Sequence, residues 1–248
     1  MWPEHKGEAE VLELEATTPD LTFNTTYQGR PVVPGGSIFQ RKWLRGRRYD
    51  ITDRATKNLA RYRYMSWDTA ISEKETAAYT VNVVGELMPD HRLLIRDVFR
   101  ERVNFPDLTD SMGTEIGVWN FDYKLSDILI EVKGPSGLAS LQMMAATDDA
   151  WWIDSLVPIS PSVSKEERAN LAAAWVKAGM VWLPYPDAGA LWLAEFEKEL
   201  FGFPNTTFSD QVDAFSQLVL YLGPILEEGY FYRREREQEL DDAVTIGG

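Results

Sequence analysis

Four acidic residues occupy positions in the sequence where an unpaired charge would be energetically unfavourable. Asp68 ends a run of alternating large residues, and Glu131 follows the apolar run Ile128–Ile130. Asp210 and Asp213 are three positions apart at the start of an amphipathic stretch, so on a helix they share one face. A carboxylate at the end of a buried strand is costly unless it is paired or bound to a metal ion. These four residues are therefore the first candidates for chemistry.

The composition removes other common kinds of catalytic site. The chain has 248 residues and no cysteine, which excludes thiolate catalysis and disulfides, and its only histidines are His5 and His91. A zinc site built on histidines or a Ser-His-Asp triad is therefore not expected. An enzyme of this composition depends on carboxylates, hydroxyls, lysine or arginine. The lack of cysteine also fits a reducing compartment.

Each acid also has a purely structural interpretation. Asp68 can be a turn residue at a strand end, and Glu131 can form an ion pair with Lys133 or Arg96. The two acids near position 210 can simply favour the first turn of a helix. If all four meet instead, their mutual repulsion is relieved only by divalent cations. All-oxygen ligation suits Mg²⁺ or Mn²⁺, and two such ions can activate water and stabilise the leaving oxygen of a phosphodiester.

The elements that must position these acids follow from the hydrophobic pattern. Alternation predicts an antiparallel meander of strands over 61–68, 80–87 and 92–99, and a nearly all-apolar run predicts a central strand over 127–132. Two shorter strands are expected over 152–159 and 180–183. Apolar periodicity and capping signals predict helices over 107–117, 138–148, 164–178, 189–200 and 209–222. The alternation of strands and helices in the second half indicates an α/β fold with a mixed sheet.

The charge is unevenly distributed along the chain. The net charge is −14, yet residues 41–63 hold nine basic residues against Asp50 and Asp53. Arg45, Arg47 and Arg48 in this segment are candidates for contacts with phosphate groups, and a solvated surface loop is the alternative.

The chain divides into three predicted parts. Residues 1–36 are polar and carry turn signals, which predicts an irregular lead-in, and residues 37–226 hold the predicted elements. Residues 227–248 are predicted to form an acidic C-terminal tail. No run of eighteen apolar residues and no secretory signal occurs, so neither a membrane span nor secretion is expected. No GxxxxGK[ST] motif occurs either, so ATP hydrolysis by that route is not expected.

Several short motifs follow one another in a specific order. They are Ser66-Trp67-Asp68-Thr69-Ala70, Ala78–Val81, Asp97–Arg100, Ile130–Gly134 with the later Gly137, the pair Lys165 and Arg168, and Phe203–Ala214. Together they resemble the C-terminal nuclease domain of the large terminase subunit of tailed phages, in the ribonuclease H-like superfamily. Phe23–Phe39 resembles the segment that joins an ATPase part to this domain.

Two positions depart from the family pattern. Ala78 stands where the family often has an acid, and Ser209-Asp210 stands where the family often has two aspartates. The second departure leaves open whether Asp210 or Asp213 is the main metal ligand on the helix.

The resemblance implies a ribonuclease H-like mixed β-sheet flanked by helices. It also implies an endonuclease that cuts concatemeric double-stranded viral DNA during genome packaging, with low sequence specificity. The implied catalytic residues and ligands of two Mg²⁺ or Mn²⁺ ions are Asp68, Glu131, Asp210 and Asp213. The implied phosphate contacts, besides the basic segment, are Lys133, Lys165 and Arg168, which would position DNA without reading bases.

The resemblance further implies partners and a location. The partners are double-stranded DNA, an N-terminal ATPase domain of the same protein, the small terminase subunit and the portal. The location is the cytoplasm of the host cell.

Two other functions use the same residues. A resolvase-like or transposase-like nuclease keeps the fold but acts on branched DNA. A packaging or assembly module with a degenerate site would instead use its acidic tail and tryptophans to bind partners. Substrate preference distinguishes the first, and a lack of metal-dependent cleavage distinguishes the second.

Overall fold

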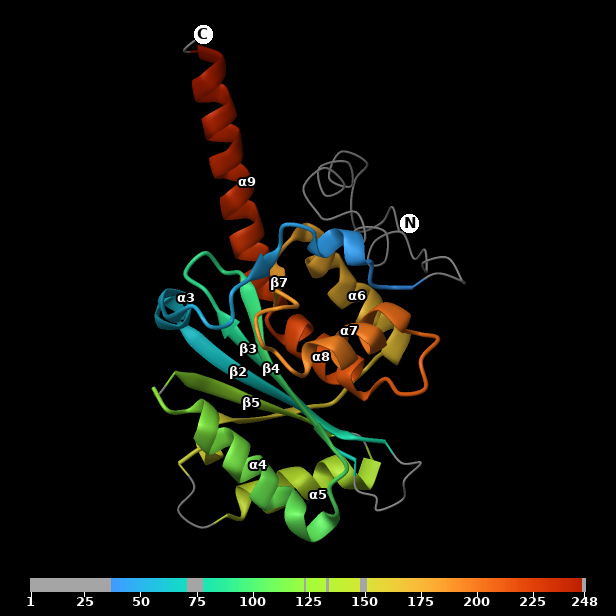
Figure 1. The fold of residues 1–248 in the computed structure, drawn as a ribbon. Helices are drawn as coiled ribbons and strands as arrows, with labels where there is room; N and C mark the ends of the chain where they lie inside the picture. Colours follow the sequence, from blue (N-terminus) through green and yellow to red (C-terminus); the bar gives the residue numbers. More distant parts are fainter. Residues whose placement is uncertain (1–36, 71–77, 123, 133, 148–150, 247–248) are drawn as a thin grey trace, which may run out of the picture.

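The computed structural model describes residues 37–70, 78–122, 124–132, 134–147 and 151–246. They form one mixed β-sheet with helices packed around it (Figure 1). The strands are β1 (Arg48–Tyr49), β2 (Tyr62–Asp68), β3 (Thr80–Leu87), β4 (Leu93–Glu101), β5 (Leu125–Glu131), β6 (Leu156–Ile159) and β7 (Val181–Pro184). Their order across the sheet is β1-β7-β4-β3-β2-β5-β6. β2, β3 and β4 are antiparallel neighbours, whereas β5, β6, β7 and β1 each join parallel to a neighbour. The predicted lead-in over 1–36 lies outside the described residues.

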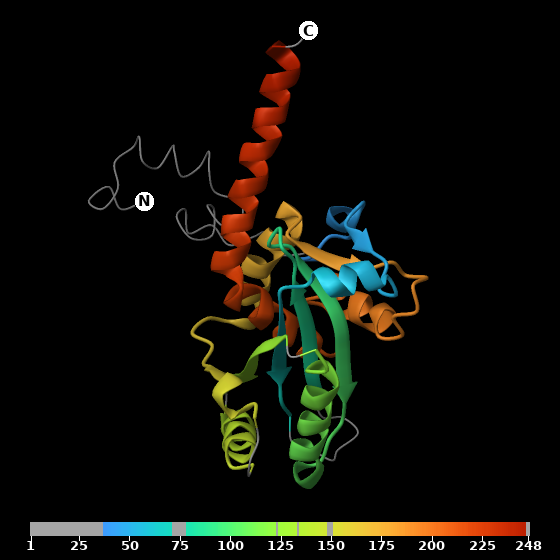
Figure 2. The same cartoon turned by 90° about the vertical axis from the view of Figure 1, so that its left-hand side faces the viewer.

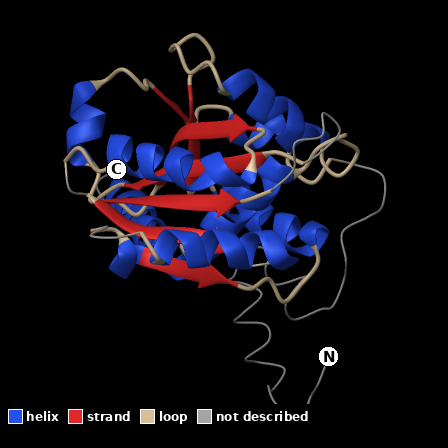
Figure 3. Ribbon diagram, turned by 90° about the horizontal axis from the view of Figure 1, so that it is seen from below, coloured by secondary structure: helices blue, strands red, loops and turns tan. Residues whose placement is uncertain are grey.

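Helices cover both faces of this sheet (Figure 3). One face packs against α4 (Phe105–Trp119) and α5 (Gly134–Ala145), and the other against α6 (Lys165–Ala178) and α8 (Asp210–Tyr221). α7 (Leu193–Gly202) packs against α8. The shorter segments are η1 (Arg41–Leu44), α3 (Arg54–Leu59) and η2 (Ile153–Ser155).

The chain ends in the helix α9 (Gly223–Ile246), whose far end projects away from the rest of the molecule (Figures 1 and 2). Much of the segment predicted as an acidic tail lies in this helix, and its charged residues over 234–236 are exposed. Among the described residues, no helix combines the length and the apolar character needed to cross a membrane.

Strand alternation decides which side chains of β2 and β5 point toward α8. Met65 and Trp67 on β2 lie in the core cluster beneath α4 and α5, so Asp68 falls on the opposite face. In β5, Ile130 belongs to the same cluster as Met65, so Glu131 also falls on the α8 face. The last residue of each strand is therefore directed to the same side of the sheet.

Local capping sets the ends of the helices that flank the site. Asn104 begins α4 by accepting a hydrogen bond from the Asp107 amide at 3.1 Å. Ser164 begins α6 in the same way, accepting from the Glu167 amide at 3.2 Å, as the capping-box pattern predicts. Gly179 ends α6 in the left-handed region with φ of 80°, which glycine adopts without steric cost.

The structure confirms most of the predicted elements and the mixed α/β class. β3 has the predicted bounds of 80–87, and the other strands of the meander differ from prediction by one or two residues. The predicted strand over 152–159 is a short 3-10 turn followed by β6, so only its second half is extended. α9 was not predicted, because its charged residues lack the apolar periodicity on which the prediction depended.

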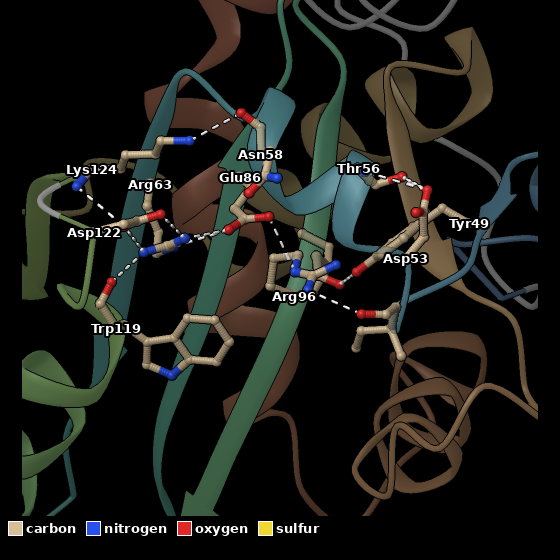
Figure 4. Close-up of polar contacts among 12 residues, drawn as sticks. Tyr49, Asp53, Thr56, Asn58, Arg63, Glu86, Arg96, Trp119, Asp122 and Lys124 are labelled. Carbon is tan, nitrogen blue, oxygen red and sulfur yellow. Dashed lines mark hydrogen bonds and ion pairs between the residues drawn. The ribbon is translucent and has the colours of Figure 1, made fainter.

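A buried network of charges joins the three antiparallel strands far from Asp68 (Figure 4). Glu86 on β3 accepts hydrogen bonds from Arg63 on β2 at 2.6 and 3.0 Å and lies 3.1 Å from Arg96 on β4. Arg63 also donates to Asp122 at 2.8 Å. All three central side chains are at most 3% exposed. One carboxylate thus lies between two guanidiniums and fixes the pairing of β2, β3 and β4.

Replacing Glu86 with alanine should destabilise the fold strongly, because two arginines would remain buried without their shared partner. We expect the free energy of unfolding to fall by about 3–5 kcal/mol, measured by urea unfolding. The control is Lys198→Ala, which removes an exposed ion pair with Glu195 at 3.3 Å and should cost less than about 1 kcal/mol. Equal losses in the two variants would contradict the structural role of the buried network.

Candidate active site

The ends of β2 and β5 bring Asp68 and Glu131 together. The two strands are parallel neighbours, and their register runs through the pair Trp67 and Ile130, one residue before the two acids. Neighbouring strands lie about 5 Å apart, and both acids point to the α8 face. The two strongest candidates from the sequence are therefore adjacent at the carboxyl ends of two central strands.

The first turn of α8 carries Asp210 and Asp213 to the same place. Ser66 on β2 donates a hydrogen bond to the Ala214 carbonyl at 2.8 Å, which fixes this turn against the sheet. The backbone amide of Tyr79 donates to Oδ2 of Asp210 at 2.8 Å, just before β3 begins. Asp210 and Asp213 are 7% and 2% exposed, so both carboxylates are held inside the protein.

Two cations of α6 contact the acid cluster, which we define as Asp68, Glu131, Asp210 and Asp213. Nη2 of Arg168 lies 2.7 Å from Oδ1 of Asp213 and 3.4 Å from Oε2 of Glu131, so one guanidinium links the two carboxylates. Lys165 forms an ion pair with the other oxygen of Asp213.

The ion-pair partner of Glu131 among the described residues is Arg168, which was not considered as its partner from the sequence. Arg96 pairs with Glu86 instead, and Lys133 lies outside the described residues. This arrangement is compatible with Glu131 as an ion-pair member and also as a site residue, because its partner Arg168 contacts Asp213 of the acid cluster as well.

The acid cluster has an excess of negative charge that acts on Asp68. The pKa of Asp68 is raised to about 8, first by burial and then by the carboxylates of Glu131 and Asp213, while Lys165 opposes this rise. Burial also raises the pKa of Asp210, against the hydrogen bond from the Tyr79 amide. Two cations therefore face four carboxylates, and Asp68 takes up a proton more readily than an ordinary aspartate.

The same carboxylates favour the charged form of Lys165, whereas they disfavour the charged form of Asp68. Burial disfavours its ammonium charge, but the nearby carboxylates, first that of Asp213, outweigh burial and raise its pKa. Its side chain is 40% exposed, so it forms the solvent-facing edge of the cluster.

The donor set fits a hard divalent cation. Within the part of the chain that the structure describes, no group of three or more acids or histidines is arranged so that it could hold a metal ion as it stands. Lys165 and Arg168 are instead placed against the oxygens of Asp213 and Glu131. The donors are all carboxylate oxygens, as Mg²⁺ and Mn²⁺ prefer, and a cation would relieve the repulsion that raises the pKa of Asp68.

The basic segment predicted to contact DNA lies away from this cluster. Arg47 donates to the Val176 and Lys177 carbonyls at the end of α6, and Arg48 pairs with Glu197 at 2.6 Å. Arg45 is exposed. Lys165 begins α6 and the Arg47 contacts lie at its end, which separates them by about 20 Å for a helix of 14 residues. The structure thus brings Lys165 and Arg168 to the acids but not Arg45, Arg47 and Arg48.

Two residues that position the site were missed or left unexplained by the sequence. Glu199 on α7 accepts hydrogen bonds from the amides of Gln211 and Val212 at 2.7 and 3.3 Å, and so caps α8 from outside. A Cβ at Gly137 would clash with the carbonyl oxygen of Glu131, so glycine lets α5 approach the end of β5. Glu199 gave no local signal, because the amides that it caps lie twelve or more residues further along.

The fold of this chain is similar to that of several solved structures. A human cytomegalovirus terminase nuclease domain superposes with a TM-score of 0.51 at 12% identity, covering 74% of this chain and 94% of that chain. A second structure of that domain, soaked with Mn and bound to an inhibitor, gives 0.48 at the same identity and coverage. A yeast mitochondrial Holliday junction resolvase gives 0.44 at 12% identity, covering 81% of this chain and 91% of that chain. No protein-family model matches the sequence, and no curated protein sequence matches it.

The chain therefore has a ribonuclease H-like α/β fold, a mixed seven-stranded sheet flanked by helices. This fold is similar to that of the cytomegalovirus terminase nuclease domain, which agrees with the fold that the resemblance implied.

Replacing Asp68 with asparagine should stabilise the metal-free protein at high pH. The carboxyl has a pKa of about 3.8 when unfolded and about 8 when folded, so the stability that it contributes is present below about pH 4 and is lost as pH rises through about 8. In EDTA we expect the free energy of unfolding of Asp68→Asn, measured by urea unfolding, to exceed that of the wild type by about 1–3 kcal/mol near pH 8. Near pH 4 the two free energies should differ little.

The control for this measurement is Asp90→Asn, which changes a half-exposed acid paired with Arg92. Its difference from the wild type should be nearly the same at both pH values. A difference for Asp68→Asn that does not change with pH would contradict the repulsion within the acid cluster.

Proposed function

We propose that this chain is a metal-dependent endodeoxyribonuclease that cuts concatemeric double-stranded viral DNA during genome packaging. The observation that carries the proposal is the meeting of four carboxylates from β2, β5 and α8 with only two cations against them. Like charges gather in this way at sites that use divalent cations. The terminase-like fold supports the choice of DNA as the substrate.

Asp68, Glu131, Asp210 and Asp213 are the residues that would hold two Mg²⁺ or Mn²⁺ ions. When bound, such ions activate water and stabilise the leaving oxygen of a phosphodiester. Asp68 is central among the acids, because the carboxylates on both β5 and α8 act on it. The Tyr79 amide orients Asp210, and Glu199 holds the first turn of α8 in place.

Lys165 and Arg168 have a second role in this proposal. Arg168 is 5% exposed and keeps Glu131 and Asp213 at a fixed separation. Lys165 is more exposed and lies at the rim, so its ammonium can exchange a carboxylate for a DNA phosphate. Lys165 and Arg168 are both proposed to contact DNA phosphates, and such contacts are independent of base sequence, in keeping with low sequence specificity.

The wider assembly is proposed from the motifs of the sequence. Residues 37–226 would form the nuclease unit, with residues 1–36 as a linker from an ATPase domain and residues 227–248 as a C-terminal extension. The small terminase subunit and the portal would be partners, in the cytoplasm of the host cell. Lys133, Arg45, Arg47 and Arg48 remain proposed phosphate contacts, of which the last three would touch DNA far from the acid cluster.

Asp68→Asn should abolish cleavage. We expect the rate of nicking of supercoiled plasmid DNA with Mn²⁺ to fall at least about 1000-fold, because the shared carboxylate contributes several kcal/mol to the transition state. Asp90→Asn is the matched control and should cut like the wild type. Circular dichroism would establish that the variant keeps its fold, and cleavage at the wild-type rate would refute the assignment of Asp68.

Substrate preference tests the packaging role separately. We expect linear and supercoiled duplexes to be cut at similar rates, with no advantage for a four-way junction, since the proposed contacts are to backbone phosphates. A strong preference for the junction would replace the packaging nuclease with a resolvase. Absence of metal-dependent cleavage of every substrate would leave a packaging or assembly module.

A further inference from the structure

An arginine–aromatic pocket, defined by Tyr79, Phe208, Arg100 and Arg102, lies directly beside the acid cluster. The rings of Tyr79 and Phe208 meet edge to face, with centroids 5.0 Å apart. Cζ of Arg100 lies 3.7 Å from the centroid of Tyr79, and Cζ of Arg102 lies 4.1 Å from it. Both guanidiniums are also within 6 Å of the Phe208 centroid. Two arginines are thus supported by one pair of rings.

This pocket is physically continuous with the acid cluster. The amide of Tyr79 donates to the carboxylate of Asp210, and Phe208 precedes Asp210 by two residues. A hollow of about 480 Å³ opens at this place, lined by Tyr79, Arg100, Phe208 and Lys198 among others. The hollow therefore begins at residues that contact a member of the acid cluster.

The charge of the pocket is positive in a chain whose net charge is −14. Arg100 and Arg102 supply this charge. The hollow beside them is lined by Arg100 and Lys198 against Glu195 and Glu199, and Lys198 pairs with Glu195 at 3.3 Å. Glu195 is 60% exposed and lies 4.0 Å from Arg100, a weak and screened pair. The carboxylate of Glu199 is engaged by the amides at the start of α8. Nε of Arg100 is buried and finds no hydrogen-bond acceptor among the described residues.

We propose that the arginine–aromatic pocket binds a backbone phosphate of the DNA. This phosphate neighbours the phosphodiester that is cut. This proposal rests on the proposed function. A guanidinium stacked on a ring keeps its N–H groups in its own plane, where they can meet phosphate oxygens in a bidentate manner. The ring of Tyr79 is covered by guanidinium groups, so the pocket suits a phosphate better than a stacked base.

Arg100 and Arg102 are therefore positioning residues rather than catalytic ones. Their guanidiniums are held by the rings before DNA arrives, which lowers the entropy lost on binding. A phosphate fixed beside Asp210 would hold the neighbouring phosphodiester over the acid cluster. The contact does not depend on base identity.

The test is DNA binding by the double variant Arg100→Gln and Arg102→Gln, measured by fluorescence anisotropy with a labelled blunt duplex in EDTA. We expect the affinity to fall by roughly tenfold and the salt slope to decrease by about 1, because the contacts with one phosphate are lost. The matched control is Arg92→Gln, which removes an arginine stacked 4.4 Å from the centroid of Trp182 just before β4 begins. The control should bind as the wild type does.

Two further variants keep the test decisive. Arg102→Gln alone changes an exposed side chain, so it should fold even if the double variant does not, and it should lower the affinity and the salt slope by less than the double variant does. The double variant Arg100→Lys and Arg102→Lys keeps the charge, so it should restore the salt slope more fully than the affinity. In cleavage assays the glutamine variants should raise KM more than they lower kcat.

The outcomes separate this proposal from the nuclease proposal. If the wild type binds DNA but does not cut it with Mn²⁺, the nuclease proposal fails and the binding comparison alone decides the pocket. If the glutamine variants match Arg92→Gln in affinity and salt slope, the pocket proposal is overturned whatever the cleavage result. Failure of the wild type to bind DNA would also overturn it.

Discussion

Repulsion among four carboxylates is the constraint on which the site depends. Asp68, Glu131, Asp210 and Asp213 come from two strands and one helix, and the pKa of Asp68, raised to about 8 by burial and its neighbours, reports their closeness. Such a group persists only because the sheet and α8 are held together by other contacts, including the hydrogen bond from Ser66 to Ala214. Lys165 and Arg168 reduce the repulsion without removing it, which leaves the cluster suited to further positive charge.

The two ends of the same strands show opposite electrostatic arrangements. Far from the site, Glu86 lies between Arg63 and Arg96, so one buried carboxylate is shared by two cations. At the site, the cations are outnumbered by carboxylates. The first arrangement stabilises strand pairing, and the second stores unfavourable interactions that a ligand can relieve.

The fold could be largely predicted from the sequence, as could the positions of the acids at strand and helix ends, for physical reasons that differ by residue. Strand alternation over 80–87 and the capping box at Ser164 are local signals, and both are confirmed. The motifs around Asp68 and Glu131 led to the correct fold class. The ion pair between Arg168 and Glu131 could not be predicted as such, because the two residues are far apart in the chain and many arginines could have served.

The sequence by itself determined the periodicities, the caps and the kinds of donor that any site could use, because these depend on residue type and on neighbours within a few positions. Only the tertiary structure decided which charges meet. The register of β2 with β5 placed Asp68 beside Glu131, and the capping of α8 by Glu199 directed Asp213 toward Arg168. The same long-range packing placed Arg47 at the far end of α6, since contacts between distant segments depend on how whole elements pack and not on local pattern.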